Sequence, residues 1–186
     1  MGQFLSIGLR ISAAIHKKDV KKHLDEEKSV DDILSQIEEK YRLTDIYERK
    51  EKDDYYVYSL KKDVLDKEYI PFIEKFYALR YYGGNNLDSA AAVEKLKSLP
   101  DTSARLTLLE KKSFQTYQEG DNVDYFYPDK WCSSEICIHS YNAILSLDGK
   151  IIMECYGSVF DFFRRSIAAQ MTEFELSKAL TVWIDG

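Results

Sequence analysis

A strict alternation of apolar with small or polar residues near the amino terminus limits the fold of this chain more than any other feature. Apolar side chains stand at every second position: Leu5, Ile7, Leu9 and Ile11. The positions between them are Ser6, Gly8, Arg10 and Ser12. Successive side chains of a β-strand point to opposite faces of the sheet, so this pattern predicts a half-buried strand that fixes the start of the chain.

Two other interpretations compete for the same residues. An export signal needs an uninterrupted apolar run of about 7–15 residues, and the alternation interrupts any such run. The stretch MGQFLS matches the N-myristoylation pattern M-G-x-x-x-[ST]. A single acyl chain anchors only marginally without a second signal, and the basic residues at 16–23 are followed directly by acids. We therefore favour the strand, and acylation of Gly2 stays open.

Composition favours one globular domain over residues 1–186. The chain is 45% hydrophobic and 31% charged, which is enough apolar material for a core. A net charge of -6 repels polyphosphate, so we expect no nucleic-acid partner. No apolar run approaches the ~18 residues that cross a bilayer, so we expect no membrane partner. Three cysteines are few and odd in number, which favours a reducing, cytoplasmic location.

The order of expected elements predicts an α+β fold with a mixed or antiparallel sheet packed against several amphipathic helices. Ser29 and Asp32 form a capping-box pattern before a helix at 30–41. Pro71 suits the first turn of a second helix, and Asp88 suits the N-cap of a third. β-prone runs predict hairpins at about 44–60 and 136–157, the latter turning at Asp148-Gly149.

Near the carboxyl end, the sequence predicts another helix and a closing strand. Ser158 is the expected N-cap of this helix, with Asp161 at the capping-box position. Helical spacing predicts that one apolar face is buried, consisting of Phe160, Phe163, Ile167 and Met171. The closing strand is expected at 181–184, and residues 102–131 are expected to be the least regular part of the chain.

The residues that could carry metal or thiol chemistry are Cys132, Cys137, His139 and Cys155. A Cys₃His zinc site is chemically sensible, but in the expected hairpin Cys155 lies on the opposite face from Cys137 and His139. Cys132 with His139 could form a nucleophile and base, yet no oxyanion hole is visible. We therefore expect no metal, cofactor or catalytic residue. The alternative is a small-ligand-binding or enzymatic domain with a pocket near Cys132, Cys137 and His139.

The segment at 114–131 interleaves aromatic and acidic residues within a chain that holds 14 tyrosines. Tyrosine and tryptophan dominate binding hot spots, and carboxylates steer a basic partner. The alternative is that these rings cover the edge of the core. The residues that we predict to contact a partner are Tyr117, Asp121, Asp124, Tyr125, Tyr127 and Trp131.

In general character, from the strand at 1–8 to the hairpin at 147–150, the chain resembles the small acidic immunity proteins of bacterial toxins. The shared features are small size, negative charge, abundant tyrosine and no recognisable catalytic motif. The resemblance implies a non-enzymatic inhibitor that occludes the active site of a basic protein partner, a toxin or effector, in the cytoplasm. It implies no particular residue, and the contact residues named above come from the aromatic and acidic pattern.

Overall fold

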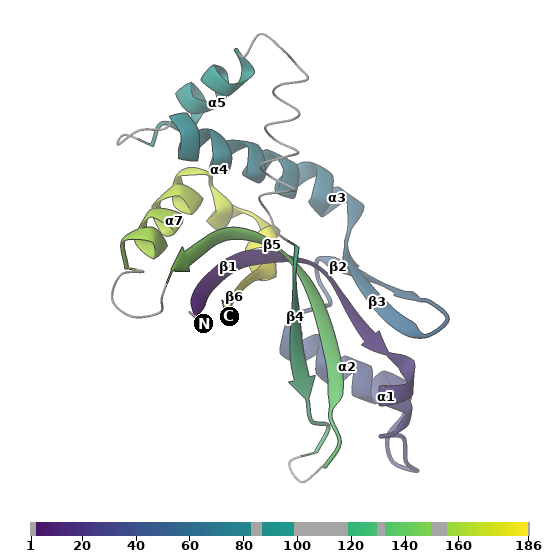
Figure 1. The fold of residues 1–186 in the computed structure, drawn as a ribbon. Helices are drawn as coiled ribbons and strands as arrows, with labels where there is room; N and C mark the ends of the chain where they lie inside the picture. Colours follow the sequence, from purple (N-terminus) through teal and green to yellow (C-terminus); the bar gives the residue numbers. More distant parts are fainter. Residues whose placement is uncertain (1–2, 83–86, 99–118, 130–132, 150–155, 186) are drawn as a thin grey trace. The chain divides into compact units, whose positions relative to one another are not determined.

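Helices and strands are mixed without a regular β–α–β repeat in the computed structural model (Figure 1), which describes residues 3–82, 87–98, 119–129, 133–149 and 156–185. The predicted α+β class with an antiparallel sheet is therefore confirmed. In these residues, no helix has the length and apolar character needed to span a bilayer. The helical segments are α1 Lys17–Lys21, α2 Val30–Tyr41, α3 Lys62–Val64, η1 Leu65–Tyr69, α4 Ile70–Tyr82, α5 Ser89–Lys97, α7 Tyr156–Ala168, η2 Met171–Glu173 and η3 Glu175–Ala179.

The amino-terminal alternation forms strand β1, Phe4–His16, as predicted. Ile7, Leu9, Ala13 and Ile15 are almost completely buried. Ser6 and Arg10 are buried as well, so the first part of the strand is covered on both faces. Residues 1–2 lie outside the described ranges, and acylation of Gly2 stays a prediction.

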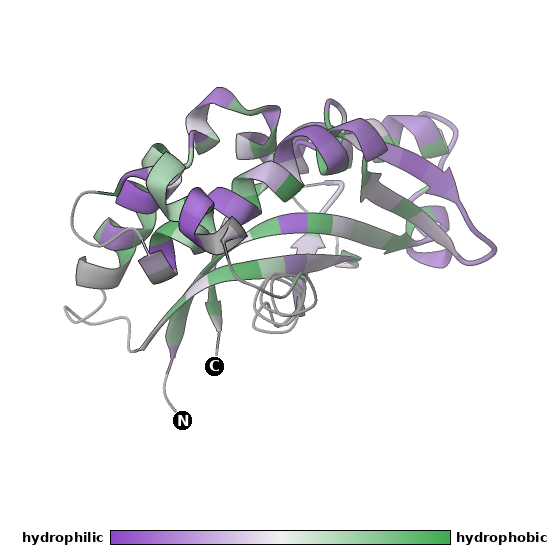
Figure 2. Ribbon diagram, turned by 90° about the horizontal axis from the view of Figure 1, so that it is seen from above, coloured by the Kyte–Doolittle hydropathy of each residue, from purple (hydrophilic) through white to green (hydrophobic). Residues whose placement is uncertain are grey.

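The described strands form one six-stranded sheet with the order β2-β3-β1-β5-β4, and β6 pairs with β1. The hairpin expected at 44–60 is confirmed as β2 Tyr47–Glu51 and β3 Tyr55–Leu60. β2 lies at one end of the order, and its residues after Tyr47 are charged and exposed. In the hydropathy colours of Figure 2 this strand is hydrophilic. Charged residues on an edge strand discourage pairing with other chains.

The second predicted hairpin is confirmed only in its first strand. β5 spans Ile136–Gly149, so the expected turn residues Asp148 and Gly149 lie within a strand. Residues 150–155 are outside the described ranges, and Tyr156 already begins α7. Within the sheet, β5 instead neighbours β4, Glu119–Phe126, which precedes it in the sequence. The prediction of a turn at 148–149 is wrong.

Packing separates the chain into two compact units, each assembled from segments distant in sequence. Unit 1 consists of Met1–Leu9, Lys62–Glu119 and Ala143–Gly186, and unit 2 of Arg10–Lys61 and Gly120–Asn142. β1 contributes residues to both units, and the single domain over 1–186 stays a prediction.

In unit 2, helix α2 covers one face of the sheet. Its capping box is formed as predicted, since the Ser29 hydroxyl accepts from the Asp32 amide and Asp32 accepts from the Ser29 amide. The helix buries Ile33, Leu34 and Ile37. The buried Tyr58 of β3 donates to the Glu38 carboxylate of α2 at 2.8 Å, which fixes the helix against this face. Burial and the bond to Glu38 raise the pKa of Tyr58.

In unit 1, aromatic rings from α4 and α7 form part of the core. Phe72, Phe76 and Phe162 are fully buried, and the rings of Phe76 and Phe162 lie 5.6 Å apart. The guanidinium of Arg165 lies 4.9 Å from the centre of the Phe76 ring and pairs with Asp161 at 2.6 Å. The predicted closing strand is confirmed as β6, Leu180–Asp185, antiparallel to β1.

The predicted buried face of α7 is wrong for three of its four residues. Phe160, Phe163 and Ile167 are 64%, 45% and 64% exposed, and only Met171 is buried. The inward face instead contains Phe162, Arg165 and Ser166. Apolar residues occur on both sides of this helix, and the cation–π contact of Arg165 with Phe76 favours the side that carries Phe162.

Gly8 lies where β1 passes between two neighbours in unit 1. A Cβ atom at this position would stand 2.4 Å from the backbone oxygen of Ala143 in β5. It would also stand 2.8 Å from the Trp183 ring of β6. A backbone atom cannot give way as a flexible side chain can, so only glycine allows this approach.

Candidate functional site

The predicted contact segment includes strand β4, whose side chains alternate between two environments. Val123 and Tyr125 are 36% and 51% exposed, and Tyr127, directly after the strand, is 51% exposed. Phe126 is buried and Asp124 is half-buried. Alternation along a strand places Tyr125 and Tyr127 on one face and Asp124 with Phe126 on the other.

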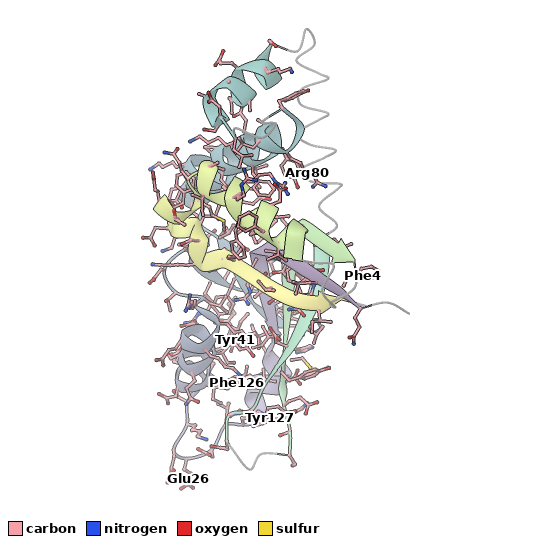
Figure 3. All side chains as sticks on the ribbon, turned by 90° about the vertical axis from the view of Figure 1, so that its left-hand side faces the viewer. Phe4, Glu26, Tyr41, Arg80, Phe126 and Tyr127 are labelled. Atoms are coloured by element: carbon pink, nitrogen blue, oxygen red, sulfur yellow. The ribbon has the colours of Figure 1, made fainter. Side chains whose placement is uncertain are left out.

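The face with Phe126 is directed towards helix α2, which lies behind β4 and β5 in Figure 1. The Lys40 ammonium lies 5.3 Å from the centre of the Phe126 ring and 5.2 Å from that of Tyr41. The Tyr41 hydroxyl donates to the backbone oxygen of Tyr125 at 3.5 Å. Figure 3 shows the labelled side chains of Tyr41 and Phe126 in this part of unit 2. Burial, with the nearby charge of Asp124, raises the pKa of Tyr41. Asp124 therefore belongs to the junction of β4 with α2.

The opposite face of the sheet in unit 2 carries exposed tyrosines from three strands. Tyr55 of β3 is 39% exposed and Tyr141 of β5 is 41% exposed. Strand register places Tyr55 opposite His16 and Val57 opposite Ala14. The neighbours Tyr56 and Tyr58 point to the buried side. We name this surface the tyrosine face and define it by Tyr55, Tyr125, Tyr127 and Tyr141.

A shallow groove of about 560 Å³ crosses the tyrosine face. Its lining comes from neighbouring strands, with Ser12 and Ala14 of β1 between Tyr55 of β3 and His139 and Tyr141 of β5. Lys52, from the turn before β3, completes one end. Small residues on the central strand and rings on the two flanking strands give the groove its floor and walls.

The structure brings together only part of the predicted contact set. Tyr125 and Tyr127 share the tyrosine face, whereas Asp124 lies on the other side of β4. Tyr117 and Trp131 are outside the described ranges, and Asp121 lies in β4 with its side chain undescribed. Sequence reasoning missed Tyr55 and Tyr141. The signal that could have found Tyr55 is the run of β-prone tyrosines at 55–58 next to the charged residues at 50–54.

Cys137 does not have the environment of a nucleophilic thiol. Burial, with the nearby charges of Asp19 and Glu135, raises its pKa, so the thiol stays protonated at neutral pH. Among the described residues, no three His, Cys, Asp or Glu side chains are grouped as metal ligands would be. Cys132 and Cys155 are outside those residues, so the predicted relation of Cys155 to His139 stays a prediction.

The tyrosine face and its groove are thus the site with the best-defined geometry in unit 2. Their chemistry consists of ring faces, hydroxyl groups, imidazole and one ammonium, set on a rigid sheet that α2 supports from behind. Comparison of the chain with protein-family models, with curated proteins and with solved structures gives no match.

Proposed function

We propose that this protein is a non-enzymatic binding protein that masks a macromolecular partner with the tyrosine face of unit 2. The observation that carries the proposal is the exposure of four tyrosines on one side of a sheet whose other side is buried. Tyrosine offers a large rigid contact area, a hydroxyl for hydrogen bonding and only two side-chain torsions to immobilise.

The finer form of the proposal is an immunity protein that neutralises a toxin in the bacterial cytoplasm. The net charge of -6 supports attraction of a basic partner over long range. The geometry gives the carboxylates a smaller role in direct contact than the sequence pattern predicts. Asp124 lies on the α2 side, and Asp129 is paired with Lys28 at 2.6 Å. Tyrosine rings therefore provide the contact and net charge provides the steering.

The test begins with a photo-crosslinking phenylalanine analogue at position 125 or position 160, each produced in the native cell. Phe160 is the matched control because it is an exposed aromatic residue of unit 1, 64% accessible. We expect one partner to be cross-linked from position 125 alone and to be identified by mass spectrometry. Binding of that purified partner is then measured by calorimetry.

The variant Tyr125→Ser/Tyr127→Ser should weaken binding of that partner at least tenfold, since each hot-spot ring contributes on the order of 1–2 kcal/mol. Phe160→Ser should bind as wild type. Both variants should keep the wild-type melting temperature because the replaced rings are exposed. Unchanged affinity of Tyr125→Ser/Tyr127→Ser would refute the proposal. For the immunity form, the partner must be toxic when expressed alone and harmless when co-expressed with this protein.

A second candidate function is binding of a small molecule, and the groove beside His139 is the observation that favours it. A volume of about 560 Å³ is in the range of ligand pockets, although the groove is open rather than enclosed. A fluorine-labelled fragment library, read by NMR, tests this function. Hits that are lost in His139→Ala and kept in Tyr127→Ser would support it.

A further inference from the structure

The groove on the tyrosine face lies over one strand, β1, and is bounded by side chains of the strands on either side. Along the part of β1 that lines the groove, β3 and β5 are the neighbouring strands. Adjacent strands lie about 4.8 Å apart, so the walls rise from backbones roughly 10 Å apart. An α-helix with its side chains is about 10–12 Å wide, which exceeds the space left between two ring-bearing strands. An extended chain fits lengthwise above Ser12 and Ala14.

Contacts within the protein hold the Tyr55 wall of the groove in place. The rings of Tyr55 and His16 lie 4.7 Å apart, and His16 Nδ1 accepts from the Lys18 amide at 3.2 Å. The Lys52 amide donates to the backbone oxygen of Tyr55 at 2.8 Å, which holds the turn beside the groove. The Tyr55 wall is therefore ordered before any ligand arrives, and pre-organisation lowers the entropic cost of binding.

Each polar side chain that lines the groove has a hydrogen-bond donor, and one of them, Lys52, is a cation. The hydroxyl groups of Ser12, Tyr55 and Tyr141 and the imidazole of His139 can donate or accept, and the ammonium of Lys52 can only donate. None of the lining residues that the structure describes carries a carboxylate. A complementary ligand therefore presents acceptors together with flat apolar surfaces, and a lysine-rich or arginine-rich peptide would find no described anionic partner here.

We propose that the groove binds an extended peptide segment in the polyproline II conformation. Such a segment has no internal hydrogen bonds, so its carbonyl oxygens are free to accept. Proline has no N–H group and therefore needs no acceptor from the groove. Pyrrolidine rings pack on aromatic side chains, and aromatic-lined grooves are a recurring mode of proline-rich recognition. The inference rests on the proposed function and names the part of the partner that occupies the groove.

The experiment titrates the purified protein with acetylated, amidated decaproline and follows backbone amide shifts by NMR. A glycine-serine peptide of equal length, a lysine decamer and a glutamate decamer serve as comparison ligands. We expect saturable binding of decaproline with a dissociation constant on the order of 0.1–1 mM, shifts at residues 12–14, 55–57 and 139–141, and at least fourfold weaker binding of the other three.

Two variants and one control locate the ligand. Tyr141→Ser removes a wall, and Ala14→Leu fills the floor; each should weaken decaproline binding at least tenfold. Phe160→Ser changes an exposed aromatic residue of unit 1 that is not part of the groove lining, and it should leave the affinity unchanged. Amide spectra and melting curves confirm that each variant is folded. Absence of saturation, equal binding of the glycine-serine peptide, or wild-type affinity of both groove variants would overturn the inference.

The proposed function and this inference can fail separately. If the cross-linked partner requires Tyr125 and Tyr127 but decaproline does not bind, only the inference is wrong. If decaproline binds in the groove but replacement of Tyr125 and Tyr127 leaves the affinity for the partner unchanged, the proposed function is wrong. The groove then remains a peptide site.

Discussion

On unit 1, helix α7 turns Phe160, Phe163 and Ile167 to solvent, whereas on unit 2 the sheet turns four tyrosines to solvent. Both surfaces expose large side chains, but their chemistry differs. Phenylalanine and isoleucine offer only apolar area, and tyrosine adds a hydroxyl that bonds to water or to a partner. Because its hydroxyl groups can bond to water when no partner is bound, the tyrosine face is suited to reversible binding.

The comparison also shows why apolar spacing alone does not assign a face to the core. In unit 2, burial follows alternation along β3 and β4, because rings on one side pack against α2. In unit 1, the outward stripe of α7 has the better helical spacing, yet the inward face contains a phenylalanine and an arginine. Contacts with Phe76 decide the orientation of α7, and they come from a helix far away in the sequence.

The largest effect should come from the inward face of α7. Phe162→Ala removes a fully buried ring and should lower the free energy of unfolding by about 3–5 kcal/mol. Phe160→Ala, two residues away and mostly exposed, should change it by less than about 0.5 kcal/mol. Urea denaturation measures both. Similar losses for the two variants would mean that Phe160 is covered. That result would contradict the difference between the exposed and buried faces of α7.

A smaller effect is expected for a buried tyrosine of unit 2. Tyr58→Phe keeps the ring and removes the bond to Glu38, with an expected loss of about 1.5–3 kcal/mol. Tyr141→Phe, on the tyrosine face, should cost almost nothing in stability. Chemical denaturation of the pair separates tyrosines that support the fold from those that face solvent, and equal losses would contradict that division.

The same buried residue predicts a pH dependence. Burial raises the pKa of Tyr47 and Tyr58 above the ordinary value. The folded state therefore holds these protons while the unfolded chain releases them, so stability is full below about pH 10 and falls above it. Urea midpoints from pH 9 to 11 should fall less steeply for Tyr58→Phe than for wild type. An identical slope would argue against burial of this hydroxyl.

A still smaller effect should follow from the support behind the tyrosine face. Ser29→Ala removes the N-cap of α2 and should cost about 1 kcal/mol. Because α2 contacts β4 through Lys40 and Tyr41, amide exchange should rise at 123–126 more than in unit 1. Ser35→Ala, at an exposed position of the same helix, is the control. Uniform exchange changes in both units would show that α2 does not specifically support β4.

The smallest change in stability is expected for the variant Phe160→Ser/Phe163→Ser/Ile167→Ser. The three side chains are exposed, so the melting temperature should stay within a few degrees of wild type. Solubility and resistance to aggregation on heating should increase, because an apolar patch is removed. Light scattering during a thermal ramp measures this difference. Increased aggregation of the variant would contradict an exposed stripe.

Local signals were enough to predict the elements that depend on neighbouring residues. Alternation predicts β1, and the Ser29–Asp32 pattern predicts both the start and the cap of α2. Asp88 caps α5 through bonds from the amides of Ala90 and Ala91, as its position indicates. Each of these depends on residues within a few positions, so the sequence contains the whole interaction.

Long-range pairing accounts for what could not be predicted. Asp148-Gly149 is a favourable turn dipeptide, but its conformation depends on how far β5 pairs with its neighbours. The tyrosine face joins Tyr55 to Tyr141 across β1, and nothing near either residue reveals that register. The aromatic and acidic pattern was enough to name Tyr125 and Tyr127, but residues 119–126 form strand β4 in a segment expected to be irregular. Alternation along that strand separates Asp124 from the two tyrosines, and this could not be predicted without knowing that the strand exists.

Gly8 has no side chain, so a position of β1 where packing excludes other residues is one that carries no functional group. A saturation library screened only for folding should return glycine at this position, because any Cβ would press on the Ala143 carbonyl. Exposed Phe4 in the same strand should accept many replacements. Depletion of variants at position 8 would therefore report how closely two strands approach and would carry no information about what the protein binds.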